Sequence, residues 1–250
     1  MNTISDSEDL YKTEVVRSVD TWAARIRKEP YYSTQLARRF QKKINSVIPE
    51  KIHAAITAAV KGMTEAVCFG VGYTSADPIT GVTFEEKEVK VDSRIAFYAK
   101  TAAAEGALTG AAGILIGLAD FPLWLTLKMK MLFEIAALYG YDATDYKERV
   151  FLLRIFELTF SGYDRKRQLL DIVNEWDDHR RHMPDSVEAF DWRTFQQEYR
   201  DYIDLAKLLQ LVPGIGAAVG TFVNYRLTNK LGETAKNAYR LRWLAGNTPS

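Results

Sequence analysis

Residues 102–118 read AAAEGALTGAAGILIGL, and four glycines recur in this stretch at steps of three and four. At about 100° per residue, these glycines fall within roughly 60° of arc on one helix face. A glycine inside a helix costs about 1 kcal/mol relative to alanine, so four cost on the order of 4 kcal/mol. Because close approach by another helix is the usual compensation, we expect tight packing against the face that carries Gly106, Gly110, Gly113 and Gly117.

A second, shorter stripe lies near the C-terminus, where Gly216, Ala217 and Gly220 share a face and Asn224 follows one turn later. We predict that the two stripes pack against each other or against a partner's copy. The glycines at 214, 216 and 220 are spaced GxGxxxG rather than GxGxxG, and no strand precedes them. A dinucleotide-binding or Walker loop therefore fails on context.

Three interpretations of the first stripe stay open. It can be tight packing in a soluble core, a transmembrane span over Gly106–Leu127, or a hairpin that dips into or lies against a membrane. The 22 residues of that span are long enough to cross a bilayer, but Asp120 and Pro122 interrupt them. The uninterrupted apolar part, Gly106–Ala119, has only 14 residues, a length typical of a buried or interfacial helix.

Helical spacing of apolar residues dominates the rest of the chain. Residues 70–81 are expected to form a loop, and residues 82–91 a short strand or the beginning of a helix. Helices are predicted over about 15–26, 36–48, 50–66, 93–118, 120–139, 144–162, 164–180, 192–211 and 215–244. Several of their ends carry local signals, such as Thr144 or Asp145 as an N-cap and Gly140 as a left-handed terminus.

The predicted fold class is all-α, a multi-helix bundle with two glycine-striped, closely packed apolar helices, because β-branched runs are almost absent. We expect a single helical domain over residues 1–250. Within it, residues 1–50 form amphipathic basic helices and residues 93–244 form the glycine-striped core. An apolar fraction of 47% and a charged fraction of 26% are ordinary for a globular protein.

Net charge and cysteine content limit the functional classes. The formal net charge is +1, so no overall field marks nucleic acid as a partner. Cys68 is the only cysteine, which excludes an intrachain disulfide and a CxxC metal site. The first 14 residues are acidic and lack an apolar run, unlike a signal peptide. We expect a cytoplasmic protein, peripheral on the inner face of the cell membrane.

The charges are segregated along the chain. Residues 25–51 hold eight basic side chains against two glutamates, whereas residues 171–204 are rich in carboxylates. A basic amphipathic helix such as 36–48 can lie on an anionic bilayer, although a solvated face balanced by the acidic segment remains the alternative. The residues expected to face anionic lipid or an acidic partner are Arg38, Arg39, Lys42, Lys43, Arg240 and Arg242.

We assign no catalytic residue and no cofactor from the sequence. His179 and His182 are three residues apart beside several aspartates, so a metal site is conceivable, but such a charged run is also typical of a solvated helix end. The serines lie in no GxSxG elbow. Aromatic side chains can line an apolar pocket or fill a core; the pocket candidates are Phe121, Trp124, Phe133 and Tyr139.

Three stretches carry a family resemblance. These are ADFPLWL at 119–125, YGYD at 139–142 followed by ERVF at 148–151, and VPGIGAAVGTFVNYRLTNKLGETAKNAYRLRWL at 212–244. Together they resemble the EcsC protein family over roughly residues 102–153 and 212–244. Residues 1–50 and 171–204 show no marker of it. The resemblance implies a bacterial, helical, membrane-associated protein of unassigned activity, and it supplies no catalytic residues.

The favoured hypothesis is a non-enzymatic, peripheral membrane protein whose partner is an anionic membrane surface or a membrane protein. A second hypothesis is a soluble helical module that encloses an apolar ligand or lipid between helices lined by the aromatic candidates. A third is a hydrolase or metal enzyme that uses the His179 and His182 region.

Overall fold

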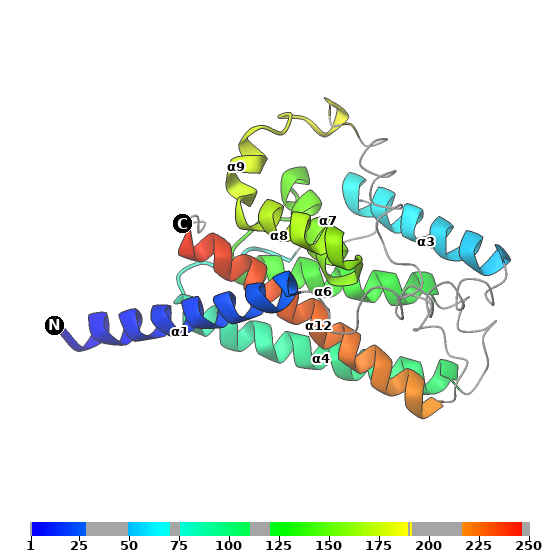
Figure 1. Cartoon of the computed structure of the whole chain (residues 1–250), viewed down its shortest axis with the longest axis horizontal. Coiled ribbons are helices and arrows are strands. Elements are labelled where there is room, and N and C mark those ends of the chain that lie inside the picture. The colour runs from blue at the N-terminus through cyan, green and yellow to red at the C-terminus, as the bar shows by residue number, and fades with distance from the viewer. Residues whose placement is uncertain are drawn as a thin grey trace.

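In the computed structural model, the described residues are 2–28, 50–70, 76–110, 121–189, 191 and 217–246. Every regular element among them is helical, as Figure 1 shows, which confirms the predicted all-α class. The elements are α1 (Asn2–Arg27), α3 (Glu50–Phe69), α4 (Phe84–Gly110), α6 (Phe121–Tyr139), α7 (Tyr146–Phe160), α8 (Tyr163–Asn174), α9 (Trp176–Arg181), the 3-10 helix η1 (Val187–Ala189) and α12 (Ala217–Leu244).

Local signals set two helix ends where the sequence predicted them. Asp145 is the N-cap of α7, and its side chain accepts a hydrogen bond from the backbone N–H of Lys147 at 2.9 Å. Gly140 ends α6 with a φ of 94°, a conformation that glycine adopts without a steric penalty. These interactions span only a few residues, which is why the sequence reveals them.

Of the two alternatives for residues 82–91, a short strand or the beginning of a helix, the structure bears out the helix. The helix begins at Phe84 rather than near Ser93, so residues 84–91 are helical and not a strand. Thr83 and Glu86 form a capping box: the Thr83 N–H donates to the Glu86 carboxylate at 2.8 Å, and the Glu86 N–H donates to the Thr83 hydroxyl at 3.2 Å. This box satisfies the first free N–H groups and starts the helix earlier than its apolar periodicity suggests.

The predicted helix over 164–180 is two helices. α8 ends at Asn174 and α9 begins at Trp176, with Glu175 between them at φ −105° and ψ 25°. The helices predicted over 36–48 and 192–211 lie outside the described residues. None of the described helices is both long and apolar enough to cross a membrane.

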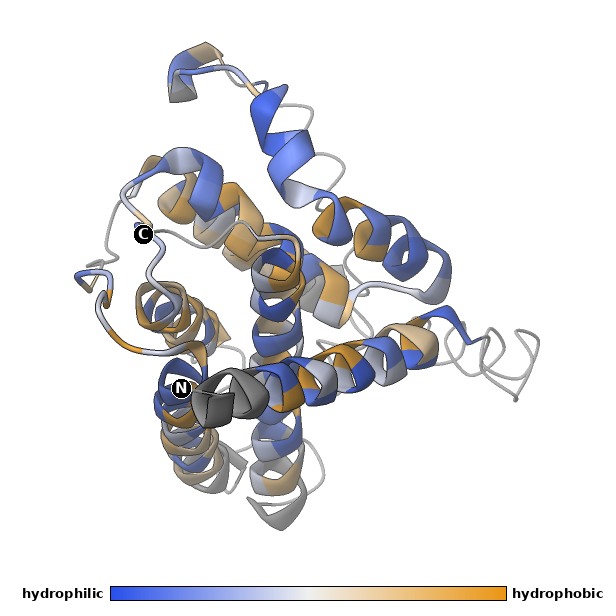
Figure 2. Cartoon of the chain, turned by 90° about the vertical axis from the view of Figure 1, so that its left-hand side faces the viewer, coloured by the Kyte–Doolittle hydropathy of each residue, from blue (hydrophilic) through white to orange (hydrophobic). Residues whose placement is uncertain are grey.

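Two helices form the centre of the core. α7 is buried on almost all sides, and α6 buries most of its length, including Leu125, Met129 and Leu132. α12 packs against α4, α6, α7, α1 and α8, and α3 covers α6 and α7. α1 is amphipathic, as the alternating colours in Figure 2 show, and buries Val15, Val19 and Trp22.

The described parts of the glycine stripes lie on two helices that pack together. α4 carries Gly106 and Gly110, α12 carries Gly220, and α4 and α12 run side by side in Figure 1. Gly113, Gly117 and Gly216 lie outside the described residues. Close approach at the stripes therefore stays a prediction.

A close approach between α4 and α12 occurs at another glycine. A Cβ added to Gly232 of α12 would lie 2.6 Å from Cγ1 and 2.7 Å from Cγ2 of Ile95 on α4. Both atoms are attached to the branched Cβ of Ile95, so they cannot move away without a change of rotamer or backbone. Glycine at this position allows the two helices to meet.

We expect Gly232→Ala to lower the free energy of unfolding by about 1–3 kcal/mol, because the added methyl group overpacks the contact with Ile95. Gly62→Ala is the matched control, since no atom lies within 4 Å of a Cβ at that exposed helical position; it should stabilise α3 by up to about 1 kcal/mol. Urea unfolding followed by circular dichroism measures both. Equal stabilisation by the two substitutions would show that α4 and α12 do not meet closely here.

Candidate functional site

Arg242 of α12 is held inside the protein by two carboxylates. Its guanidinium lies 2.8 Å from the carboxylate of Glu148 on α7 and 2.9 Å from that of Asp177 on α9. The Tyr239 hydroxyl donates to Glu148 at 2.7 Å, and the guanidinium lies 3.7 Å from the ring centroid of Tyr141. Burial is the largest single influence and lowers the pKa of Arg242, but the negative charges around the guanidinium, with Glu148 first among them, together raise it overall.

Arg240, two residues before Arg242 in α12, forms a second buried ion pair. Its Nε and Nη2 each lie 2.6 Å from an oxygen of Glu88 on α4, in bidentate geometry. The hydroxyls of Tyr11 and Tyr139 donate to the same carboxylate at 2.7 and 3.1 Å. Burial raises the pKa of Glu88, but the hydrogen bonds from Arg240 and Tyr11 lower it below its ordinary value. Glu88 therefore stays ionised at neutral pH.

These two pairs correct the predicted surface role of Arg240 and Arg242. Arg242 is 3% exposed, and both guanidiniums are neutralised within the chain. Their partners lie on helices distant in the sequence, so the basic charge of the last helix does not reveal them. The other residues predicted for this surface, Arg38, Arg39, Lys42 and Lys43, lie outside the described residues.

The aromatic candidates for an apolar pocket all belong to the core of the described residues. Phe121, Trp124, Phe133 and Tyr139 are all buried along α6. Phe121 stacks on Trp124 with ring centroids 5.7 Å apart, and the Trp124 indole N–H donates to the Asn224 side chain at 3.1 Å. Neither cavity described below is lined by any of these four side chains. The apolar spacing correctly marked these four residues as buried, and their role in a ligand pocket stays a prediction.

His179 and His182 lie on and just after α9, at the edge of the molecule. Nδ1 of His182 is 2.9 Å from the backbone oxygen of Asp178, and the side chain is exposed. The pKa of His179 is lowered mainly by burial and, to a smaller extent, by the charge of Arg154. No group of three or more His, Cys, Asp or Glu side chains in the described ranges is arranged to hold a metal ion. The structure thus brings no further ligand to these two histidines from the part that it describes.

A polar cleft of about 750 Å³ lies beside Arg242, between α7, α9 and the end of α12. Its basic side chains face carboxylates: Lys147 lies 3.3 Å from Asp185, and Arg180 pairs with Asp145. Positive and negative charges are therefore nearly balanced in the cleft, and it has no net preference for an anion or a cation.

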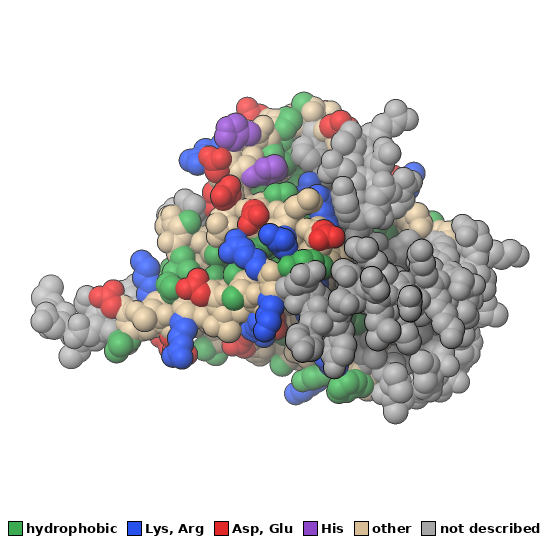
Figure 3. All heavy atoms as spheres, in the orientation of Figure 1, with side chains coloured by type: hydrophobic (Ala, Val, Ile, Leu, Met, Phe, Trp, Pro, Cys, Tyr) green, Lys and Arg blue, Asp and Glu red, His purple; other side chains and the backbone are tan. Residues whose placement is uncertain are grey.

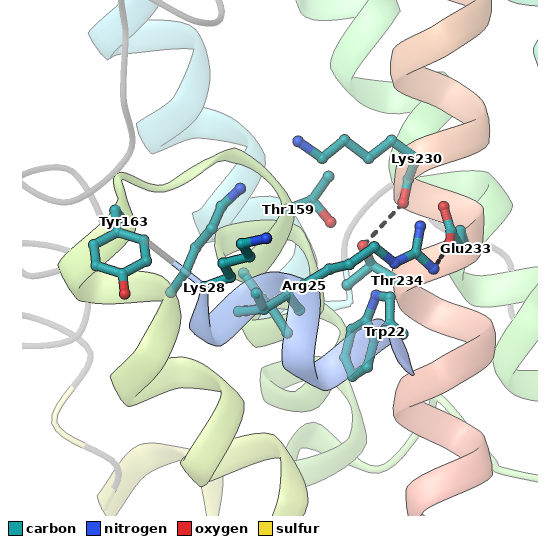
Figure 4. A pocket seen from close by; sticks show the side chains of 11 residues that line it. Trp22, Arg25, Lys28, Thr159, Tyr163, Lys230, Glu233 and Thr234 are labelled. Atoms are coloured by element: carbon teal, nitrogen blue, oxygen red, sulfur yellow. Dashed lines mark hydrogen bonds and ion pairs between the residues drawn. The ribbon is translucent and has the colours of Figure 1, made fainter. Parts of the chain in front are cut away.

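A second cavity, of about 300 Å³, has a strongly unbalanced lining. It lies where α1, α7, α8 and α12 meet, and Figure 4 shows it from close by. We call it the basic pocket. Its lining residues are Trp22, Arg25, Ile26, Lys28, Leu158, Thr159, Tyr163, Lys166, Lys230, Glu233 and Thr234.

The charged side chains of the basic pocket come from three parts of the chain. Arg25 comes from the last turn of α1, Lys28 from the residue directly after it, Lys166 from α8 and Lys230 from α12. Glu233 is the one carboxylate in the lining. Arg25 lies 3.2 Å from Glu233. In Figure 3 basic side chains gather around the end of α1 and the neighbouring α8. Four basic side chains and one carboxylate from separate parts of the chain thus line one cavity.

The floor of the basic pocket is apolar. Trp22 is 5% exposed and Leu158 is 1% exposed, and Ile26 packs against the same core. A lining that is basic at the rim and apolar at the floor can accept an amphiphilic anion. In the sequence, Arg25, Lys28 and Lys230 belong to basic stretches. No local spacing links them to Lys166, so the sequence does not show that all four line one pocket.

Comparisons with known proteins agree with the resemblance seen in the sequence motifs. The model of the EcsC protein family matches residues 13–244, so the likeness also covers residues 13–50 and 171–204, where the motifs gave no marker. "Protein EcsC" of Bacillus subtilis (strain 168) is 44% identical over 220 residues, 88% of this chain and 90% of that protein. "Uncharacterized protein YdbA" of the same strain is 30% identical over 208 residues, 83% of this chain and 68% of that protein. No solved structure matches.

Proposed function

This chain belongs to the EcsC protein family, and from that premise we propose that it is a non-enzymatic protein that attaches peripherally to the anionic, cytoplasmic face of the cell membrane. The basic pocket is the observation that carries the proposal. Four basic side chains and one carboxylate line it, over an apolar floor. Each basic residue close to an anionic bilayer contributes about 1 kcal/mol to binding.

The chain continues from the basic pocket into another basic stretch of the sequence. Lys28 lines the pocket at the end of α1, and residues 29–49 follow it directly. That stretch includes Arg38, Arg39, Lys42 and Lys43, which were predicted to face anionic lipid. The basic residues of both elements would add to the attraction toward an anionic surface.

The non-enzymatic part of the proposal is supported by the buried carboxylates. Glu88 and Glu148 both contact arginines of the α12 motif, and each is held by its arginine within 2.8 Å. A carboxylate engaged in this way stabilises the fold and is poorly placed to exchange protons with a substrate.

We expect the protein to co-sediment with vesicles that contain phosphatidylglycerol and not with vesicles of pure phosphatidylcholine. Binding should weaken as salt rises, because ions screen the attraction between exposed charges. Arg38→Glu combined with Lys42→Glu should weaken binding by at least about 30-fold, since two basic residues contribute about 1 kcal/mol each.

Lys12→Glu combined with Arg17→Glu is the matched control, because it makes the same change in net charge at exposed positions of α1. It should change vesicle binding much less. Binding that is equally strong on neutral vesicles and indifferent to salt would contradict the proposal.

A further inference from the structure

We propose that Lys128 is a proton switch: when its amine takes up a proton, the first two turns of α6, residues 121–128, separate from α4, α7 and α12 while the rest of the core stays closed. The switch controls whether the apolar side chains that these two turns bury become accessible. It does not depend on the proposed membrane attachment, because all of its parts belong to the core of the chain.

Lys128 places its amine inside the core without a polar partner. The residue is 0% exposed, and its Nζ has no hydrogen-bond acceptor among the described residues. The amine lies over the ring of Trp124, 4.5 Å from the ring centroid. A core strongly disfavours an ammonium that lacks a carboxylate or other acceptor, whereas it tolerates the neutral amine. The closed structure therefore suits the neutral form of Lys128.

The charges on the neighbouring helices do not compensate an ammonium at this place. α6 packs against α3, α4, α7 and α12. Glu105 of α4 attracts the proton, but burial has the larger effect and lowers the pKa of Lys128 to about 7. The described carboxylates of α3, α7 and α12 each pair with a basic residue other than Lys128; they are Glu65, Glu148, Glu157 and Glu233.

Trp124, the ring against the amine, joins the beginning of α6 to two other helices. Its indole N–H donates to the Asn224 side chain of α12 at 3.1 Å, and its ring centroid lies 6.0 Å from that of Phe160 on α7. Trp124 and Lys128 are four residues apart, so their side chains share one face of α6. Movement of a charged Lys128 toward water therefore displaces the side chain that holds the first turns of α6 in place.

The position of Lys128 along α6 keeps the opening local. The first two turns include exposed residues such as Leu123, which is 58% exposed. Most residues from 129 to 139 are buried, and Glu134 accepts a hydrogen bond from Tyr98 of α4 at 2.7 Å. Parts of a protein with fewer buried contacts open at a lower free energy than its core. The first two turns can therefore open while the following turns remain packed.

The switch acts over the pH range between the pKa values of the closed and the opened form. In the opened form the amine meets water and keeps its proton up to about pH 10.4, whereas the closed form releases the proton near pH 7. Between these values opening takes up one proton, so the equilibrium constant of opening rises about tenfold for each unit by which the pH falls. Well below pH 7 both forms hold the proton, and opening no longer increases.

Hydrogen exchange of the full chain, followed by mass spectrometry and corrected for the intrinsic exchange rate at each pH, measures opening along α6. In residues 121–128 the equilibrium constant of opening should rise about tenfold from pH 9 to pH 8. About 1 M urea should change it less than about threefold, because local opening exposes little surface, but should raise opening of residues 130–139 at least about fivefold. An equal urea dependence in the two segments would overturn the switch, because α6 would then open only with the whole protein.

Lys128→Met should abolish the pH dependence of opening in residues 121–128, because opening then takes up no proton there. Lys130→Met is the matched control, since it makes the same change at an exposed position of α6. It should keep the rise of about tenfold for each pH unit. Retention of that rise in Lys128→Met would overturn the switch, because another group would then take up the proton.

Asn224→Ala tests the part that Trp124 plays. The substitution removes the acceptor of the indole N–H, so opening of residues 121–128 should increase at least about threefold at every pH and keep its pH dependence. Asn229→Ala is the matched control, because the Asn229 side chain donates only to the backbone of its own helix, at Tyr225. It should leave opening within about twofold. Equal effects of the two substitutions would count against the switch, since Trp124 would then not hold the first turns.

Discussion

Replacing Arg242 by methionine should lower the free energy of unfolding by about 3–5 kcal/mol, because removal of one partner from a buried ion pair leaves an uncompensated charge. The side chains of Arg242 and Glu148 are each only 2% exposed, so water cannot solvate the carboxylate that remains. Urea unfolding monitored by circular dichroism and by tryptophan fluorescence measures the loss.

Two further variants separate the ion pair from the loss of packing. Arg181→Met is the control, because Arg181 pairs with Asp178 at the surface with 74% and 62% of the side chains exposed; it should change stability by less than about 1 kcal/mol. Adding Glu148→Gln to Arg242→Met should restore part of the lost stability, since no charge is then left buried. A loss as small as that of the surface control would show that the pair contributes little.

Lys128→Met should raise the free energy of unfolding at pH 7 by on the order of 4 kcal/mol, because one pKa unit corresponds to about 1.4 kcal/mol. The side chain of Lys128 on α6 is fully buried, and its Nζ has no hydrogen-bond acceptor among the described residues. Its ammonium lies 4.5 Å from the Trp124 ring centroid. Burial lowers the pKa of Lys128 to about 7, against a smaller opposing effect of Glu105.

The pH dependence of this gain follows from the direction of the shift. In the unfolded chain the amine keeps its proton up to about pH 10.4, whereas the folded protein releases it near pH 7. Between these values the unfolded state binds more protons, so the wild type becomes more stable as the pH rises. The advantage of Lys128→Met should therefore be largest at pH 7 and below, and should shrink toward pH 10.

Lys130→Met is the matched control, because Lys130 is exposed two residues further along α6. Its effect should stay within about 0.5 kcal/mol and should not vary over the same pH range. Thermal unfolding at pH 7, 8 and 9 measures both variants. A constant gain for Lys128→Met at all three values would show that the amine does not change its charge in this window.

The helical class and most helix ends could be read from the amino-acid sequence, because the forces that set them act within a few residues. Apolar periodicity predicted α3, α6, α7 and α12. As predicted, Asp145 caps the beginning of α7 and Gly140 ends α6. The errors were also local in kind. The capping box at Thr83 and Glu86 starts α4 before its apolar periodicity begins. The break between α8 and α9 at Glu175 carries neither glycine nor proline to mark it.

The roles of the charged residues depend on contacts across the chain. In the sequence, Arg240 and Arg242 cannot be told from two basic residues on a surface. Their carboxylate partners lie 152 and 94 residues away along the chain. Lys28, Lys166 and Lys230 are likewise brought to one pocket from the end of α1, from α8 and from α12. The sequence shows where the charged residues are along the chain but not what their side chains face. The packing of α1, α4, α7, α8 and α12 determines which charges are buried in pairs and which line a cavity.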